Sequence, residues 1–388
     1  MSSLRFLTAG ESHGPALVGI IEGIPSGLRL DAEMLLAQAK RRKLGYGRGN
    51  RQNIETDEIR ILTGVRRGVT LGSPISLLLE NKDHVRWQEI MRVDPPQDDT
   101  PPARQVHVPR PGHADRVGGI KYDFDDLRNV LERASARETA MRVGLGTVAR
   151  TLLAQLGVAL TSRVVRIGRA VDESPWRAAT NEEIDASPVR ALDPAAAAAM
   201  MQEIDTAKAA GDALGGVFEV VAHGVPVALG SYAQWDRRLE GEVGKAFLSL
   251  NAIKGVEMGL GFGASAIRGS EAHDAYEPDP DRRTRYRTNR AGGIEGGMTT
   301  GQPIVVRAAM KPIATLMKPL DSVDLRSGES TLAHIERADT CAVPAAAVIG
   351  ESLLALVLAN AVLEKFGGDS LGELRERVQA WEGTVRAR

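Results

Sequence analysis

The chain has 388 residues, long enough for one large domain or several ordinary ones. Its 49 lysines and arginines against 50 aspartates and glutamates give a net charge of −1. This balance excludes a global field that would attract nucleic acid or an anionic membrane. With 43% hydrophobic and 26% charged residues, we expect a soluble globular protein without nucleic-acid or membrane partners.

The single cysteine, Cys341, cannot form an internal disulfide, which favours a reducing, cytoplasmic location. The N-terminal stretch lacks a signal-peptide pattern, because Gly10 and Glu11 interrupt it. We expect Cys341 to be a packed, inert thiol, because its local motif holds no histidine.

Two short apolar runs, 4–9 and 16–22, predict strands joined by a polar turn that presents His13. A histidine between Ser12 and Gly14 is less typical of core filler than one in an apolar stripe. The alternative is a turn histidine that only hydrogen-bonds to the backbone.

A helix is predicted from an N-cap at Asp31 to Lys43, followed by short strands over 54–79. The C-terminal end of this helix is basic and includes Arg42, and Arg48 follows among glycines that allow a close approach to a ligand. Cations also suit a helix C-terminus, so a solvated basic end is the alternative. The Pro- and Asp-rich stretch 93–104 predicts a mobile loop.

The stretch 110–139 holds His113 in a turn and then predicts a helix from Asp125 or Asp126 towards Leu156. On such a helix Arg133 and Arg137, four residues apart, would share one face and repel each other unless an anion lay between them. The alternative is that both arginines point into water and pair with neighbouring glutamates.

The motif GLGTVA at 144–149 superficially matches a dinucleotide-binding fingerprint, but it falls inside the helical pattern and not after a strand. We interpret its glycines as sites of close packing. Beyond it, 157–168 and 214–230 predict strands that enclose a helix over 194–210. Strands followed by a long helix would then occur twice, which suggests an internal duplication.

The C-terminal part is rich in glycine, with patches in 240–262 and 289–303 on either side of a charged segment. That segment, 275–290, predicts a second mobile loop, either a lid or a disordered excursion. A strand is predicted over 305–310. The apolar run 345–366 carries Glu351 and predicts a buried helix, not a membrane span.

Two histidines in turns, an aspartate (Asp339) and a set of arginines suit proton-coupled chemistry on a small polyanion, such as loss of phosphate. The arginines in anion-binding contexts are Arg42, Arg48, Arg110, Arg133 and Arg137. We find no HExxH, CxxC or carboxylate array at metal spacing, and therefore expect no metal.

Seven motifs, in order, resemble those of the chorismate synthase family over essentially the whole chain. The three strongest are GESHGPAL at 10–17, ERASARETA at 132–140 and RADTCAVPAAAVIGESL at 337–353. The others are RRKLGYGRG at 41–49, RPGHAD at 110–115, GGIEGGMTTGQP at 292–303 and MKPIAT at 310–315. The chain departs from many members in having Ala338 where they carry serine or histidine, a change that leaves the neighbouring arginine and aspartate intact.

The resemblance implies an α+β fold, a β-α-β sandwich with internal pseudo-symmetry, in which 1–388 form a single domain of two related halves and assemble as a homotetramer. It implies a lyase of the shikimate pathway that converts 5-enolpyruvylshikimate 3-phosphate to chorismate and phosphate. This 1,4-elimination requires reduced FMN without net redox change. Whether NADPH reduces the flavin on this chain is left open.

The resemblance also implies site residues. His13 would be the acid for the departing phosphate, His113 would control protonation of the reduced flavin, and Asp339 would assist the proton acceptor. Flavin contacts would come from Arg133, Ala134, Ser135, Asn251, Ala252, Gly296, Lys311, Pro312, Ile313, Ala314, Thr315 and Arg337. Substrate contacts would come from Ser12, Arg42, Arg48, Arg110 and Arg137, with Arg42 and Arg48 alternatively serving NADP.

Two other functions are compatible with these residues. One is a flavin-dependent oxidoreductase, or another phosphate-eliminating lyase, on the same scaffold. The other is a non-catalytic anion- or nucleotide-binding protein. The presence of both histidines and Asp339 argues against the second, because simple binding needs none of them.

Overall fold

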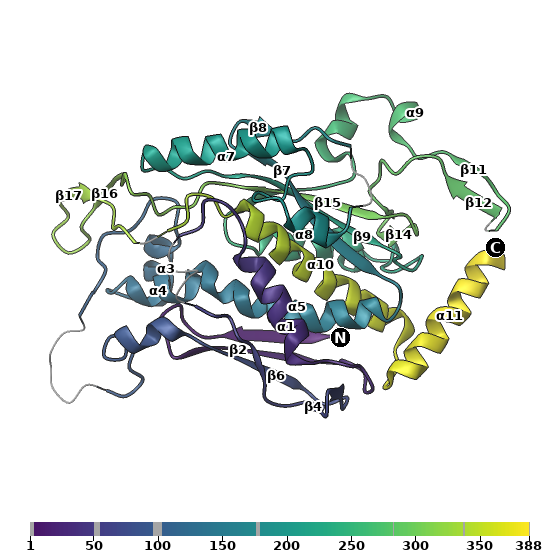
Figure 1. Cartoon of the computed structure of the whole chain (residues 1–388), viewed down its shortest axis with the longest axis horizontal. Coiled ribbons are helices and arrows are strands. Elements are labelled where there is room, and N and C mark those ends of the chain that lie inside the picture. Colours follow the sequence, from purple (N-terminus) through teal and green to yellow (C-terminus); the bar gives the residue numbers. More distant parts are fainter. Residues whose placement is uncertain are drawn as a thin grey trace.

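The computed structural model describes residues 4–49, 55–95, 103–175, 179–281, 283–336 and 338–387. Helices and antiparallel sheets alternate along the chain, so the expected α+β class is confirmed (Figure 1).

The first sheet is antiparallel and has the order β1-β2-β6-β3. Its strands are β1 (Arg5–Ala9), β2 (Ala16–Glu22), β6 (Ile75–Glu80) and β3 (Arg60–Ile61), with a small hairpin of β4 (Val65–Arg66) and β5 (Val69–Thr70) beside them. Side chains alternate across β2, where Leu17 and Ile21 are buried and Ile20 is exposed. The two strands expected at the start of the chain are therefore present, and the turn between them carries His13.

The second sheet is also antiparallel and has the order β10-β15-β9-β7-β8. Its strands are β10 (Ile253–Met258), β15 (Ile304–Met310), β9 (Gly216–His223), β7 (Ala159–Ile167) and β8 (Ala170–Val171). β7, β9 and β15 confirm the strands expected in these regions.

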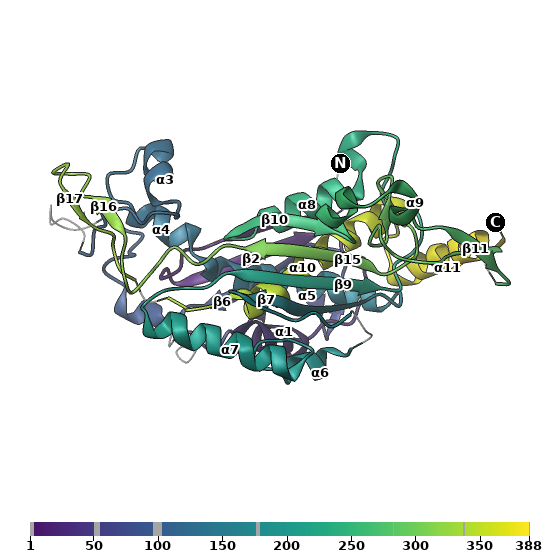
Figure 2. The ribbon, with the colours of Figure 1, turned by 90° about the horizontal axis from the view of Figure 1, so that it is seen from above.

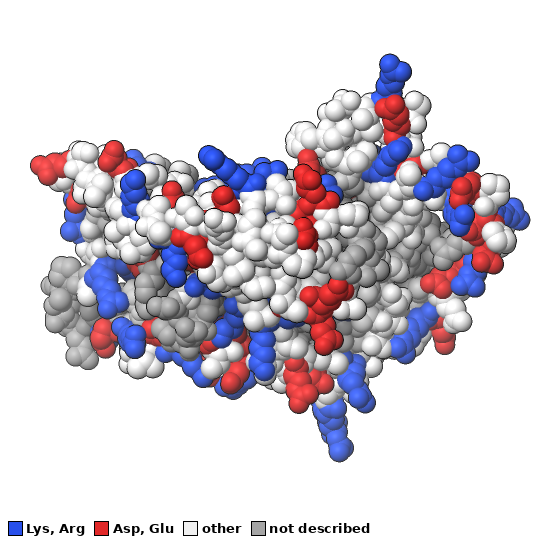
Figure 3. Space-filling model, turned by 45° about the horizontal axis from the view of Figure 1, so that its top comes forward, with Lys and Arg blue, Asp and Glu red and all other residues white. Residues whose placement is uncertain are grey.

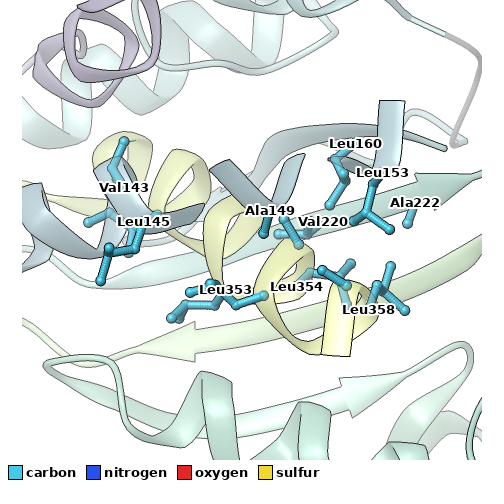
Figure 4. Close-up of a cluster of buried hydrophobic side chains, with 14 of the residues drawn as sticks. Val143, Leu145, Ala149, Leu153, Leu160, Val220, Ala222, Leu353, Leu354 and Leu358 are labelled. Carbon is cyan, nitrogen blue, oxygen red and sulfur yellow. The ribbon is translucent and has the colours of Figure 1, made fainter. Parts of the chain in front are cut away.

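Two long helices lie between the sheets: α5 (Thr139–Ala154) packs on β2 and β6, and α10 (Val343–Phe366) packs on β7 and β9. They also pack on each other, and α1 (Ala32–Lys43) contacts both (Figure 2). Leucines of α5 and α10 interdigitate beside Val220 and Ala222 of β9 (Figure 4). The core of the protein is formed by this layer of helices together with the inner faces of the two sheets.

The glycines of the 144–149 motif serve this packing, as expected. A Cβ on Gly146 would lie 2.3 Å from the Cβ of Ser352 on α10, and one on Gly144 would lie 3.0 Å from Ile59. Only glycine lets the two helices approach this closely.

Helix α10 is the one helix in the described chain that is long and apolar enough to cross a membrane. In its most apolar window, 89% of the residues are buried inside the protein. It is followed by Gly367, whose φ of 62° lies in the left-handed region. The expectation of a buried helix over 345–366 is confirmed.

The remaining helices lie around these layers (Figure 1). They are α3 (Asp115–Tyr122), α4 (Arg128–Ala134), α6 (Asn181–Asp185), α7 (Pro194–Ala209), α8 (Leu239–Leu248), α9 (Gly269–Ala272) and α11 (Leu371–Ala387). Small hairpins pair β13 (Ile294–Glu295) with β14 (Met298–Thr299) and β16 (Asp321–Val323) with β17 (Ser330–Leu332). On the face seen in Figure 3, basic and acidic side chains are interspersed.

The expected continuous helix from Asp125 to Leu156 is wrong. Helix α4 ends at Ala134, Ser135 is extended with φ −63° and ψ 140°, and its side chain caps the short 3₁₀ helix Ala136–Glu138 that precedes α5. A serine hydroxyl that bonds the backbone competes with helix continuation. Arg133 and Arg137 therefore do not share a helix face.

The structure describes only part of the first segment expected to be mobile, and it shows a hairpin in the second. Within 93–104, residues 96–102 lie outside the described part of the chain. The segment 275–290 carries a two-stranded hairpin, β11 (Tyr276–Asp279) with β12 (Arg283–Tyr286). The hairpin projects beside the C-terminus (Figure 1). Its mobility stays a prediction.

Candidate active site

A cavity of about 260 Å³ opens where the end of α1, the α4–α5 junction and the start of α10 meet. It is lined by Ser12, His13, Arg42, Arg48, Gly49, Glu55, Trp87, Arg110, His113, Leu131, Ser135, Ala136, Arg137, Thr139, Leu250, Asn251, Ala252, Met310, Ile313, Ala314, Thr315, Glu336, Ala338, Asp339, Ala342, Ala345, Ala346 and Ile349. These side chains come from segments spread over most of the sequence.

The structure brings together most of the expected site residues. His13, His113 and Asp339 line the cavity, as do the expected substrate residues Ser12, Arg42, Arg48, Arg110 and Arg137. Of the expected flavin contacts, Ser135, Asn251, Ala252, Ile313, Ala314 and Thr315 line it, whereas Arg133, Ala134, Gly296, Lys311 and Pro312 do not. Arg337 lies outside the described residues.

The expected contacts that do not line the cavity have other neighbours. Arg133 donates to the backbone oxygens of Thr8, at 2.9 Å, and Gly10, at 3.0 Å. Lys311 Nζ donates to the carbonyl of Gly112, at 2.6 Å, and so touches the turn that carries His113. Gly296 lies in the β13–β14 hairpin. Their roles toward a flavin stay predictions.

His13 is held by a buried carboxylate. Its Nδ1 lies 2.9 Å from each carboxylate oxygen of Glu132, and its backbone N–H donates to the same side chain at 2.8 Å. Burial would raise the pKa of Glu132, but His13 and Arg128 outweigh burial and lower it. Glu132 is therefore an anion that fixes a proton on Nδ1, so Nε2 is the ring nitrogen left to act on a ligand.

His113 has the same arrangement with different partners. Its Nδ1 lies 2.6 Å from the Asp115 carboxylate, which is fully buried and also accepts from Arg110 Nε at 2.8 Å. Burial would raise the pKa of Asp115, but hydrogen bonds from His113 and Arg110 hold it well below its usual range. Arg110 Nη1 also donates a hydrogen bond to Thr315 Oγ1, at 2.8 Å. This bond connects the turn that carries His113 to the segment after β15.

Arg42 and Arg137 meet at one buried carboxylate, Asp57. Asp57 is 1% exposed and has a left-handed backbone with φ 53°. It pairs with Arg42 at 3.4 Å and with Arg137 in a short ion pair. Burial would raise the pKa of Asp57, but these two arginines lower it.

Burial lowers the pKa of Arg42 to about 10, although Asp57 opposes this change, so the guanidinium stays charged near neutral pH. Arg137 also bonds Asn81, at 3.0 Å, and Glu55, at 3.3 Å. The two arginines are thus held in place by the protein before any ligand binds.

Arg48 and Asp339 form a further ion pair, with 2.7 Å between Nη1 and Oδ2. The other oxygen of Asp339 accepts from the backbone N–H of Gly49, at 2.7 Å. Two buried polar atoms in the cavity wall, Arg48 Nε and Asn251 Oδ1, have no hydrogen-bond partner in the described chain. Buried polar groups are rarely left unpaired, so these two atoms point to a polar ligand.

One wall of the cavity is apolar. Ala342, Ala345, Ala346 and Ile349 line it from the first turns of α10. Small side chains there leave room for a flat ring system, and the start of a 24-residue helix carries a partial positive charge. An aromatic, anionic cofactor such as FMN fits this combination of an apolar wall, arginines and unpartnered polar atoms.

Sequence reasoning missed the side chains that hold the site: Glu55, Asp57, Trp87, Asp115 and Glu132. Asp115 and Glu132 stand within the RPGHAD and ERASARETA motifs, and the close spacing of His113 and Asp115 was a signal for their pairing. The others come from distant segments, and no local pattern marks them. Cys341 is buried, and burial raises the pKa of its thiol to about 11, as expected for an inert thiol.

No group of three or more potential metal ligands occurs among residues for which the structure gives a placement. Most of the charged groups of the cavity are joined in the pairs described above.

Comparison with known proteins agrees with the motifs. The family model for chorismate synthase matches residues 4–363. The chain belongs to the chorismate synthase family. The chorismate synthase of Desulforudis audaxviator is 54% identical over 387 residues, with 99% of this chain and 98% of that protein covered. Those of Desulforamulus reducens and Brevibacillus brevis are 52% and 51% identical, with 99% and 97% of this chain and 99% and 98% of those proteins covered.

A solved structure described as a crystal structure of chorismate synthase superposes with a TM-score of 0.80, at 40% sequence identity and 99% coverage of both chains. Family membership over nearly the whole chain makes this protein a carbon–oxygen lyase that forms chorismate in the shikimate pathway.

Proposed function

We propose that the cavity binds reduced FMN together with 5-enolpyruvylshikimate 3-phosphate and eliminates phosphate to give chorismate. The observation that carries this proposal is the pair of histidines on one cavity, each with Nδ1 held by a buried carboxylate and surrounded by four arginines. Binding alone would not need two oriented proton carriers. When bound, reduced FMN would supply electron density for breaking the C–O bond and an acceptor for the C6 proton, without net oxidation.

His13 acts as the acid for the departing phosphate. Glu132 holds Nδ1 and favours the imidazolium form, because a nearby anion stabilises the cation. The Nε2–H of that imidazolium can then be donated to a phosphate oxygen.

His113 would lie beside the bound reduced flavin and control its protonation state. Asp115 fixes the ring through Nδ1 and Arg110 keeps Asp115 ionised. This arrangement orients His113 but does not make it a nucleophile.

Asp339 assists removal of the C6 proton, in a relay that includes Ser12 and Ser135. Its two oxygens are held by Arg48 and the Gly49 backbone, so the carboxylate has a fixed position in the cavity wall. Asn251 Oδ1 is a free acceptor for a ring N–H of the flavin.

Arg42, Arg48, Arg110 and Arg137 hold the phosphate and carboxylates of the substrate, and Ser12 lies beside them. Guanidinium groups recognise such anions through paired hydrogen bonds. NADPH as the reductant of the flavin, with Arg42 and Arg48 as its contacts, is the alternative assignment for these two residues.

The finer description of the fold belongs to this proposal: a β-α-β sandwich of two pseudo-symmetric halves in a cytoplasmic homotetramer. The sandwich and its two halves are supported by the position of α5 and α10 between two antiparallel sheets, with each sheet followed by one long buried helix.

An anaerobic assay with the substrate and chemically reduced FMN tests the proposal. We expect chorismate and phosphate in equal amounts, no net oxidation of the flavin, and no product with oxidised FMN. Activity in the dark with NADPH and oxidised FMN would show a built-in reductase.

Two results would overturn the proposal. Net turnover of a nicotinamide with the substrate would favour the oxidoreductase alternative. A folded protein that binds flavin but forms no chorismate would favour a non-catalytic binding role.

A further inference from the structure

A tryptophan, Trp87, lies beside His13 in the cavity wall, and the proposed function gives it no task. It follows the 3₁₀ helix Lys82–Arg86 and is 5% exposed. The ring centroids of Trp87 and His13 lie 4.0 Å apart and their planes differ by 19°, so the two rings are stacked. The indole therefore covers one face of the imidazole and restricts its rotation.

The same indole also attracts cations. The guanidinium carbon of Arg104 lies 4.5 Å from the Trp87 ring and that of Arg128 lies 5.1 Å from it. The face of an indole is the best aromatic surface for a cation. Two arginines and one histidine thus gather around Trp87, and of these side-chain types only imidazole has an unperturbed charge change near neutral pH.

Some of the other polar and charged groups around His13 favour its imidazolium form, and others disfavour it. Glu132, at Nδ1, favours the imidazolium, while Arg128 shares Glu132 and weakens this effect. His84 donates from Nδ1 to the backbone oxygen of His13, at 2.9 Å. The arginines that line the cavity, Arg42, Arg48, Arg110 and Arg137, disfavour a further cation. Because these arginines disfavour the imidazolium form of His13, a second contact that stabilises it, in addition to Glu132, would offset their effect.

We propose that Trp87 is a positioning residue that holds the His13 ring in place and favours its imidazolium form through cation–π stacking. The proposal rests on the proposed function only in giving that imidazolium the role of acid for the departing phosphate. The interaction itself belongs to the protein without flavin or substrate.

Titration of His13 by NMR tests this interaction without turnover. The protein is labelled with ¹³C at histidine Cε1, and His13→Asn identifies the His13 signal among the seven histidines. In Trp87→Leu we expect the pKa of His13 to fall by about one unit, the size of a partly desolvated cation–π contact. In Trp87→Phe, which keeps a smaller aromatic face, we expect a smaller fall. Trp235→Leu, at an exposed tryptophan, should leave the His13 signal unchanged and serves as the control.

A second measurement separates electrostatics from packing. Protein made with fluorinated tryptophan keeps the shape of the indole but has a weaker negative face. We expect the pKa of His13 to fall in this protein as well, with little change in melting temperature. The fluorinated protein also tests the cation–π contact if Trp87→Leu does not fold.

The pH profile of chorismate formation should follow the titration. Because loss of the contact lowers the pKa of His13, activity of Trp87→Leu should decline at a lower pH than in the wild type, and Trp87→Phe should restore part of the range. An unchanged His13 pKa in the Trp87 variants and in the fluorinated protein would overturn the proposal. Failure of the wild type to form chorismate would overturn the proposed function and leave the titration result intact.

Discussion

Arg48 and Asp339 are partners in one ion pair, with 2.7 Å between Nη1 and Oδ2. The sequence motifs had suggested separate roles, one as an anion-binding arginine and the other as an aid to proton removal. The pair joins the glycine-rich stretch after α1 to the segment that leads into α10, and both residues line the cavity. Any change of one residue therefore alters the other.

Asp339→Asn should lower kcat by about 10²–10⁴-fold, because an amide does not accept the proton that a carboxylate accepts. We expect FMN binding, followed by flavin fluorescence, to change only a few-fold. Arg48→Lys is the matched variant, since it keeps a charge beside an intact Asp339 and should retain more turnover. Near-normal turnover of Asp339→Asn would remove Asp339 from the proposed chemistry.

His113→Ala should keep flavin-dependent substrate binding but lose most turnover, because the proton carrier is removed while Arg110 and Asp115 remain paired. Asp115→Asn should fall between this variant and the wild type, since the amide oxygen can still accept from Nδ1 but lacks the charge. Anaerobic kinetics together with substrate titration separate binding from chemistry. If His113→Ala turned over normally, the role given to His113 would be wrong.

Glu351 on α10 is a buried anion among arginines, and its loss should destabilise the fold. It pairs with Arg41 at 2.7 Å, with Arg190 at 3.4 Å, and with Arg150 in a short ion pair. Burial would raise the pKa of Glu351, but Arg41, Arg150 and Arg190 lower it to about 2. At neutral pH, Glu351→Gln should lower the free energy of unfolding by about 3–5 kcal/mol, because buried arginines lose their anion.

The pH dependence of this loss has a definite sign. A carboxyl whose folded pKa is depressed contributes stability above its unfolded pKa, about 4.3, and loses it as the pH falls towards about 2. The gap between wild type and Glu351→Gln in urea denaturation should therefore close as the pH falls below about 4. Glu364→Gln, at an exposed position on the same helix, is the control. A gap that stayed constant with pH would mean that Glu351 is not charged in the folded protein.

Gly146→Ala should destabilise the protein by about 1–3 kcal/mol, because its Cβ would overlap Ser352 on α10 in a packed interior. Gly244→Ala on α8 is the matched control. A Cβ there meets no atom within 4 Å, and alanine should stabilise the helix by up to about 1 kcal/mol. Thermal or urea unfolding measures both. Equal effects of the two substitutions would contradict close packing of α5 against α10.

Local patterns in the sequence were sufficient for most of the elements. Asp31 caps α1 through a hydrogen bond to the Met34 N–H, as its position predicted, and the apolar run after Pro344 is the buried helix α10. Such signals depend on residues near one another in the chain. The break at Ser135 was missed because helix periodicity continues through 128–154, and only the hydroxyl cap and the buried partners of Arg137 interrupt it.

The sequence by itself determined the family of this protein, most of its strands and helices, and the residue types that carry charge and protons. Only the tertiary structure decided that His13 pairs with Glu132, Arg137 with Asp57, and Arg48 with Asp339. His13 and Glu132 are 119 residues apart in the chain, Asp57 and Arg137 are 80 apart, and Arg48 and Asp339 are 291 apart. An ion pair in a buried site depends on distance in space and on the loss of water around it, and neither is encoded in spacing along the chain.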